Sequence, residues 1–178
     1  MRSVSCLRVI ISVCLCVVSA WQDDVGMTHK MRLALREQVR EAFHHAYDSY
    51  MLNGFPHDVV NPLSCRGENT WGSITLTLLD LLDTLAIMGN ATEFERGVEW
   101  CVEHLSFDQD ETVSLFEINI RALGGLLAAH ALSLDTDLKL LTKTYPGQYR
   151  GGLLPLAEDL GRRLLPALET DTGSEFCA

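Results

Sequence analysis

Five stretches of the chain space their apolar residues at intervals of three and four positions, which is the spacing of a helix with a buried face. The pattern predicts helices over residues 31–51, 73–88, 93–105, from 112 or 114 to 134, and 154–168. Strict alternation of apolar and polar residues over several positions is absent from the sequence, so no strand is expected. The sequence therefore predicts an all-α protein whose helices are joined by loops.

Residues at the ends of these stretches carry helix start and stop signals. Ser73 and Thr92 are the expected N-caps of the second and third helices, and Thr112 or Ser114 opens the fourth. Gly89 is placed to end the second helix. The segment between the first two helices contains Phe-Pro, Asn-Pro and Arg-Gly pairs, so we expect it to be an irregular loop.

Two of the predicted helices, over residues 74–88 and 113–127, are apolar on nearly every side. A helix of this kind is buried on more than one face. The first and last helices carry polar faces instead, so we expect an inner layer of buried helices covered by an outer layer of amphipathic ones. An incomplete α/α barrel built of helix hairpins explains this difference, and an irregular helical bundle is the alternative.

A charged pair interrupts the second of these apolar helices. Glu117 precedes Arg121 by four residues, so the two lie on one face in the favourable order, and Gly124 and Gly125 follow on the same thin polar stripe. An ordinary solvated salt bridge is one interpretation. The other is the wall of a cleft, because the stripe is narrow and its glycines allow a ligand or another helix to approach closely.

Asp80 and Asp83 raise the same question in the second predicted helix, where they lie three residues apart on one face. A structural role is one interpretation, because an aspartate beside Thr84 can form a local hydrogen bond or bind a neighbouring helix end. A role in the site is the other.

The charge of the chain narrows the classes of partner. The chain has 178 residues and a formal net charge of −10. An acidic chain repels phosphate backbones, so nucleic acid is not an expected partner. Docking on anionic lipid is disfavoured for the same reason.

The first twenty residues are typical of a signal sequence. Arg2 precedes an apolar stretch over residues 7–18 that is too short to span a bilayer, and Val-Ser-Ala offers a cleavage site before Trp21. A cleaved signal peptide over residues 1–20 is the preferred interpretation, and a retained signal-anchor is the alternative. Both place the rest of the chain in the lumen of the secretory pathway.

Two further features fit a lumenal chain. Cys65, Cys101 and Cys177 remain after the signal, and an odd number of cysteines in an oxidising compartment leaves one thiol without a partner in the chain. Asn90-Ala-Thr is a sequon for N-glycosylation that directly follows a helix end. No Cys/His cluster is present in the sequence, so no zinc site is expected.

Several motifs together resemble glycoside hydrolase family 47, in its subgroup of ER degradation-enhancing α-mannosidase-like proteins. They are Phe-His-His-Ala-Tyr-Asp-Ser-Tyr at 43–50, Asn-Pro-Leu-Ser-Cys-Arg-Gly at 61–67, the segment ending in Leu-Asp-Thr-Leu at 73–85, and Phe-Glu-Ile-Asn-Ile-Arg-Ala-Leu-Gly-Gly-Leu-Leu at 116–127. The resemblance runs over about residues 31–173. It identifies residues 21–173 as the N-terminal part of a family 47 catalytic domain and leaves residues 174–178 as a divergent tail.

The resemblance implies an inverting, calcium-dependent α-1,2-mannosidase with an (α/α)₇ barrel that trims high-mannose N-glycans of misfolded glycoproteins for ER-associated degradation. Glu117 matches the general acid of the family, Arg121 matches a sugar-contacting arginine, and Asp83 is a further candidate for substrate binding. Cys65 matches a cysteine that forms a disulfide with a downstream or partner cysteine, which makes a lumenal oxidoreductase a candidate partner.

The resemblance also implies what the chain lacks. The base and the calcium ligand of the family lie downstream of the matched segment, so the chain is expected to be an inactive fragment in the ER lumen, with no metal site of its own. Two other functions stay open. One is a non-catalytic adaptor that binds mannose glycans or client proteins, and the other is a helical scaffold in which Glu117 and Arg121 form a structural salt bridge.

Overall fold

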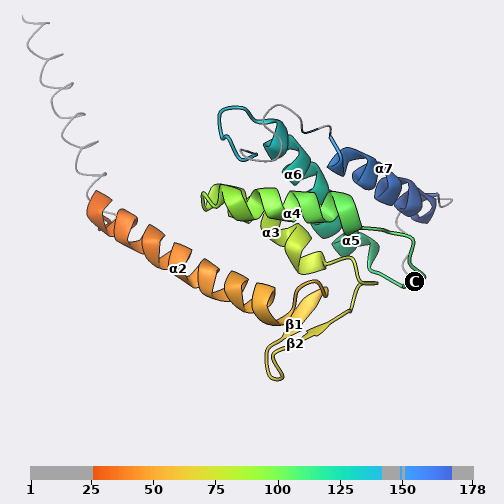
Figure 1. Cartoon of the computed structure of the whole chain (residues 1–178), viewed down its shortest axis with the longest axis horizontal. Coiled ribbons are helices and arrows are strands. Elements are labelled where there is room, and N and C mark those ends of the chain that lie inside the picture. The colour runs from red at the N-terminus through yellow and green to blue at the C-terminus, as the bar shows by residue number, and fades with distance from the viewer. Residues whose placement is uncertain (1–25, 142–148, 150, 170–178) are drawn as a thin grey trace, which may run out of the picture. The chain divides into compact units, whose positions relative to one another are not determined.

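A computed structural model describes residues 26–141, 149 and 151–169 of the chain (Figure 1). The chain forms two compact units, Met1–Phe43 and His44–Ala178. The expected signal segment over residues 1–20, the tail over residues 174–178 and Cys177 lie outside the described residues.

The described part of the first unit is helical. Helix α2 spans His29–Asn53, and Thr28 opens it, because its hydroxyl accepts a hydrogen bond from the backbone N–H of Met31 at 3.2 Å. The helix predicted over residues 31–51 is therefore confirmed. Its apolar stripe before residue 44 faces solvent, with Leu35 and Val39 both exposed.

A short antiparallel hairpin follows α2. Strand β1, Val59–Asn61, pairs with β2, Arg66–Glu68, in the register Val59↔Glu68. The prediction that this segment forms no strand is wrong. The Asn-Pro pair does mark the start of the hairpin turn, but the Arg-Gly pair lies inside β2. Strands of three residues are too short to show alternation.

Helix α3, Leu76–Ile87, forms the centre of the second unit and buries five leucines. The expected N-cap Ser73 is wrong, because the helix starts three residues later, after Thr75 in the left-handed region at φ 56°. No side chain at this position caps the helix. Its first amides are bound from another segment instead: the N–H groups of Leu76 and Thr77 donate to the carboxylate and the carbonyl of Asp58, respectively.

Helix α4, Ala91–His104, packs antiparallel to α3 after a turn at Gly89, whose φ of 78° confirms it as the helix end (Figure 1). The N-cap is Asn90 rather than the expected Thr92, and its Oδ1 accepts from the N–H of Glu93 at 3.2 Å. Gly97 lets the two helices approach, because a Cβ there would lie 2.7 Å from a methyl group of Leu82.

The helix predicted to end at residue 134 consists of three consecutive pieces. Helix α5, Leu115–Ile118, starts at the N-cap Ser114, continues as the π-helical turn η1, Asn119–Leu123, and then as α6, Gly124–Leu134. Of the two expected starts, Ser114 is confirmed: its hydroxyl accepts from the N–H of Glu117. Leu115–Leu134 is long and apolar enough to cross a membrane, although one such helix is weak evidence because core helices have the same properties.

Helix α7, Leu153–Leu164, and the 3₁₀ turn η2, Leu165–Leu168, confirm the last predicted helix. Helix α3 contacts α4 and α6, α6 contacts α7, and α7 contacts α4 (Figure 1). The largely apolar helices α3 and α6 therefore pair with each other, and each is covered by an amphipathic partner, α4 or α7. This alternation of helix hairpins is the arrangement that the sequence predicts.

Candidate active site

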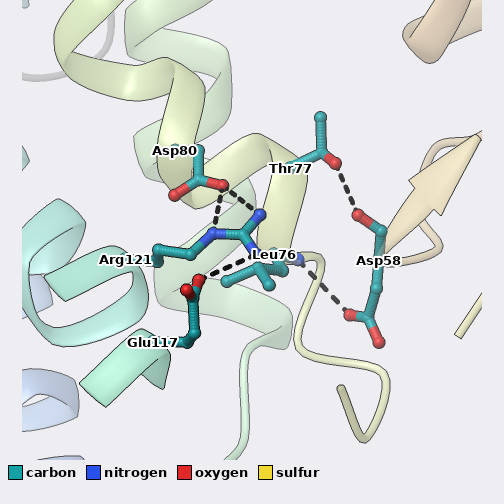
Figure 2. Close-up of polar contacts among 6 residues, drawn as sticks. All are labelled: Asp58, Leu76, Thr77, Asp80, Glu117 and Arg121. Atoms are coloured by element: carbon teal, nitrogen blue, oxygen red, sulfur yellow. Dashed lines mark hydrogen bonds and ion pairs between the residues drawn. The ribbon is translucent and has the colours of Figure 1, made fainter. Parts of the chain in front are cut away.

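Arg121 lies between two carboxylates from different helices (Figure 2). Its Nε and Nη2 both donate to Oδ2 of Asp80 on α3, at 2.9 and 2.6 Å. Its Nη1 lies 3.7 Å from Oε2 of Glu117, one turn earlier on its own helix. The predicted pairing of Glu117 with Arg121 is present, but the closer partner of the arginine is Asp80.

The three charged side chains are partly exposed. The side chain of Glu117 is 43% exposed to solvent, and those of Arg121 and Asp80 are 30% and 31% exposed. Phe116 and Ile120 beside Glu117 are exposed as well. The carboxylate of Glu117 therefore lies on an open surface with apolar neighbours rather than within a closed core.

An aromatic ring covers one side of the arginine. The guanidinium carbon of Arg121 lies 5.6 Å from the ring centroid of Trp71, within the range of a cation–π interaction. Trp71 belongs to the loop between β2 and α3. The conformation of this loop therefore helps to fix the position of the arginine.

Asp58 organises that loop from within. It is completely buried, and its Oδ2 accepts backbone hydrogen bonds from Thr70, Trp71 and Ser73 at 2.8–3.1 Å. Its Oδ1 accepts from Leu76 at 3.3 Å (Figure 2). One carboxylate thus satisfies four N–H groups and connects the hairpin, the tryptophan loop and the start of α3.

The loop stores backbone strain close to the charged cluster. Ser73 and Thr75 both have positive φ angles, 62° and 56°, which non-glycine residues rarely adopt. Thr75 is also buried, and its hydroxyl donates to the carbonyl of Pro56 at 2.9 Å. Such residues persist only where surrounding contacts impose them, and they cluster at functional sites.

The π-helical turn sets the spacing of the two residues taken from the apolar helix. Glu117 lies in the last α-helical turn before it, and Arg121 lies inside it. Single π turns within α-helices are frequent at functional sites. Beyond the turn, a Cβ at Gly125 would lie 2.7 Å from the carbonyl oxygen of Leu79, so the glycine allows α6 and α3 to touch.

Asp83 does not join this cluster in the described structure. Its Oδ1 accepts a hydrogen bond from the hydroxyl of Thr84 at 3.2 Å. This is the local bond that the structural interpretation of the sequence predicts. Of the two aspartates on α3, the one that contacts Arg121 is Asp80.

The remaining predicted residues lie away from the cluster. Cys65 is an exposed thiol in the turn of the β hairpin, at φ 51°, and Cys101 is a buried thiol on α4, so the two do not form a disulfide. Asn90 lies at the start of α4. Among the described residues no group of three His, Cys, Asp or Glu side chains could hold a metal ion.

The sequence pattern did not identify Trp71 or Asp58 as part of this site, and it could not choose between Asp80 and Asp83. The choice between Asp80 and Asp83 depends on how α6 lies against α3, which periodicity does not give. Trp71 and Asp58 lie in irregular segments. The only signal for Asp58 is an acidic residue in a turn-rich stretch that precedes Asn-Thr-Trp-Gly-Ser, a run of residues typical of loops with free backbone amides.

Comparison with known proteins shows that the chain is similar to the members of one family. The sequence model of glycosyl hydrolase family 47 matches residues 42–177. ER degradation-enhancing alpha-mannosidase-like protein 2 of Mus musculus is 49% identical over 141 residues, which are 79% of this chain and 24% of the mouse protein. Alpha-mannosidase I MNS5 of Arabidopsis thaliana is 43% identical over 185 residues, which are 96% of this chain and 31% of the plant protein.

A solved structure agrees with these matches. The alpha-1,2-mannosidase from Trichoderma reesei superposes with a TM-score of 0.64 at 29% identity, over 80% of this chain and 30% of the fungal chain. The chain therefore spans between about a quarter and a third of the length of these relatives.

Proposed function

Because the chain belongs to glycosyl hydrolase family 47, we propose that it forms the part of an α-1,2-mannosidase domain that supplies the general acid. The relative of known structure is an (α/α)₇ barrel, and the helix hairpins of this chain form part of that architecture. The observation that carries the proposal is the position of Glu117. Its carboxyl group is accessible to a ligand and is paired with an arginine that a second carboxylate holds in place.

In an inverting hydrolysis, Glu117 would donate its proton to the oxygen that leaves with the departing sugar. A second carboxylate, about 6.5–9.5 Å away, must activate a water molecule on the opposite face of the ring. Asp80 is poorly suited to this second role, because its Oδ2 accepts two hydrogen bonds from Arg121. In this proposal the described residues supply the acid and the base comes from elsewhere in the domain, so we expect the 178 residues to show no hydrolysis by themselves.

Arg121 would bind sugar hydroxyls while it orients Glu117. Its Nε and Nη2 are used by Asp80, and Nη1 points towards Glu117. Trp71 covers one side of the guanidinium and limits its movement. A substrate hydroxyl would therefore meet an arginine that is already oriented, which lowers the entropy lost on binding. The calcium ion on which the family depends would require ligands from outside the described residues.

The names of the relatives support a proposal for the substrate and the location. Several of them are named ER degradation-enhancing alpha-mannosidase-like proteins, so we place the chain in the ER lumen, where it would act on high-mannose N-glycans of misfolded glycoproteins. Asn90 would carry a glycan there. The exposed thiol of Cys65 at the tip of the hairpin is accessible for a mixed disulfide with a lumenal oxidoreductase.

A chimera tests the catalytic assignment. The segment of the mouse relative that aligns with this chain is replaced by the chain's own residues, and release of mannose from a high-mannose N-glycan is followed by mass spectrometry. Glu117→Gln keeps the shape of the side chain and cannot donate the proton, so hydrolysis should fall by about 10²–10⁴-fold. Glu158→Gln is the matched control, because Glu158 is an exposed glutamate on α7 that pairs with Arg162.

Four outcomes separate the functions left open by the sequence. Loss of hydrolysis in a folded Glu117→Gln chimera supports the enzyme. A chimera that binds the glycan but does not hydrolyse it, with or without the substitution, supports the adaptor. Loss of stability and activity in proportion supports the scaffold, whereas normal trimming by a folded Glu117→Gln chimera removes the catalytic role.

A further inference from the structure

A groove of about 750 Å³ lies between the end of α2 and α4. None of the residues of the charged cluster around Arg121 lines it. The groove is lined by three aromatic, three aliphatic or thioether, and four polar or charged side chains, and by one glycine: Tyr47, Asp48, Met51, Leu52, Phe55, Leu78, Asn90, Glu93, Arg96, Gly97 and Trp100.

One face of α4 forms a wall of the groove along most of the helix. Asn90, Glu93, Gly97 and Trp100 follow one another at intervals of three and four residues, so they lie along one side of the helix. From the first to the last of them the helix rises by about 15 Å. Gly97, in the middle of this face, is buried against Leu82 and Leu78 of α3.

The lining is polar at one end of the groove and aromatic at the other. At the end near Asn90, the hydroxyl of Tyr47 donates to Oε2 of Glu93, and Nη2 of Arg96 lies 2.5 Å from the same oxygen. At the other end the lining is aromatic, where the ring centroids of Phe55 and Trp100 lie 5.2 Å apart. A ligand that suits the groove needs hydrogen-bonding groups at one end and apolar C–H surface at the other.

Asn90 is positioned to carry such a ligand. Its Oδ1 caps α4, which leaves Nδ2, the atom that is glycosylated in a sequon, without a hydrogen-bond partner among the described residues. Thr92, the third residue of the sequon, is exposed. The amide that would carry the glycan therefore already lies on the wall of the groove.

We propose that the groove between α2 and α4 holds the inner N-acetylglucosamine residues of a glycan attached to Asn90. A transferase would form the bond from Nδ2 to the anomeric carbon as a lipid-linked diphosphate leaves and the amide loses one proton. The sugars offer hydroxyl and acetamide groups to Glu93 and Arg96, and C–H faces to the aromatic end. Attachment at the groove wall gives them an effective concentration that an unattached peptide or glycan lacks.

This inference is independent of the proposed catalytic role, because it uses neither Glu117 nor hydrolysis. It also accounts for an exposed apolar residue. Leu52 lines the groove with 84% of its surface exposed, and a bound sugar would cover part of it.

Hydrogen–deuterium exchange of the full chain, expressed in cells that glycosylate secretory proteins, tests the proposal. Thr92→Ala removes the sequon at an exposed position, and Thr92→Ser keeps it. Backbone amides of residues 51–55 should exchange about tenfold more slowly in the glycosylated chain and in Thr92→Ser than in Thr92→Ala, the change given by ~1.4 kcal/mol of local stabilisation.

A second pair of variants shows whether the groove itself provides the protection. Leu52→Ser should reduce the protection without loss of the glycan. Leu63→Ser, at a residue that is 97% exposed and lies in the turn of the hairpin, should leave it unchanged. An Asn90 that carries no glycan overturns the proposal. A glycosylated chain whose residues 51–55 exchange as fast as those of Thr92→Ala overturns it too, and shows that the glycan extends into solvent.

Discussion

Replacing Asp58 by alanine removes the acceptor of four backbone N–H groups that hold the loop before α3. Three of them, on Thr70, Trp71 and Ser73, are donated to Oδ2, and the fourth, on Leu76, is donated to Oδ1. The side chain has no exposed surface, so water does not replace it without rearrangement of the loop.

The size of the destabilisation depends on whether each N–H group can reach water after the substitution. Thr70 and Ser73 are exposed residues, so their amides can turn to water once the carboxylate is gone. The N–H of Leu76 is buried and stays unsatisfied, which costs ~1–3 kcal/mol. Adding the loss of the charge-assisted bond to Trp71, we expect Asp58→Ala to reduce the free energy of unfolding by about 3–5 kcal/mol. Asp58→Asn keeps one carbonyl oxygen, so about 2 kcal/mol is expected.

Urea unfolding followed by tryptophan fluorescence measures this difference. With a slope of about 2 kcal/mol per molar urea, a loss of ~4 kcal/mol lowers the midpoint by about 2 M. Asp48→Ala is the matched control, since Asp48 is an exposed aspartate on α2, and it should change the free energy by less than ~0.5 kcal/mol. An Asp58→Ala variant within ~0.5 kcal/mol of the wild type would refute the role given to this carboxylate.

Two further predictions concern the helix contacts and the buried thiol. Gly125→Ala should destabilise the chain by about 1–3 kcal/mol, because the new methyl group would lie 2.7 Å from the carbonyl oxygen of Leu79. Gly124→Ala, whose nearest neighbour would lie at 3.6 Å, should be neutral or stabilising by up to ~1 kcal/mol in the same unfolding assay. Burial raises the pKa of the Cys101 thiol from 9.0 to about 12, so the unfolded chain releases this proton first as the pH rises. The contribution of this thiol to the free energy of unfolding is therefore complete below pH 9.0 and is lost towards about pH 12. The loss is up to ~1.4 kcal/mol per pH unit. If the free energy of unfolding has the same slope against pH in wild type and Cys101→Ala between about pH 9 and 10, this assignment is contradicted.

The helices could be predicted because each buries a stripe that repeats with the period of the α-helix. The same reasoning indicated that α3 and α6 form the inner layer, since both are apolar on nearly every side. It missed the β hairpin, because strands of three residues are too short for alternation to appear. It misplaced the start of α3 as well, because the residue that binds the first amides, Asp58, lies 18 positions before Leu76.

The site could be predicted only where charge interrupts an apolar pattern. Glu117 and Arg121 stand out for that reason, and the structure places them together. The partner from α3 could not be chosen from the sequence, since Asp80 and Asp83 share a face and only the packing of α6 on α3 separates them. Trp71 gives no periodic signal, because its position is set by hydrogen bonds to a distant carboxylate.

The π-helical turn has a consequence for insertions and deletions in this helix. A π turn holds one residue more than the α turn it replaces, so deleting a residue within Asn119–Leu123 could restore regular α-helix without moving α6 away from α3. Because the π turn absorbs the extra residue, the helical segments on both sides keep their rotation about the axis when that residue is removed. Deletion of Ile120 would place Glu117 three residues before Arg121, a spacing that still puts both side chains on one face of the helix. The pairing of the acid with its arginine and the packing at Gly125 would therefore both tolerate the loss of one residue from this turn.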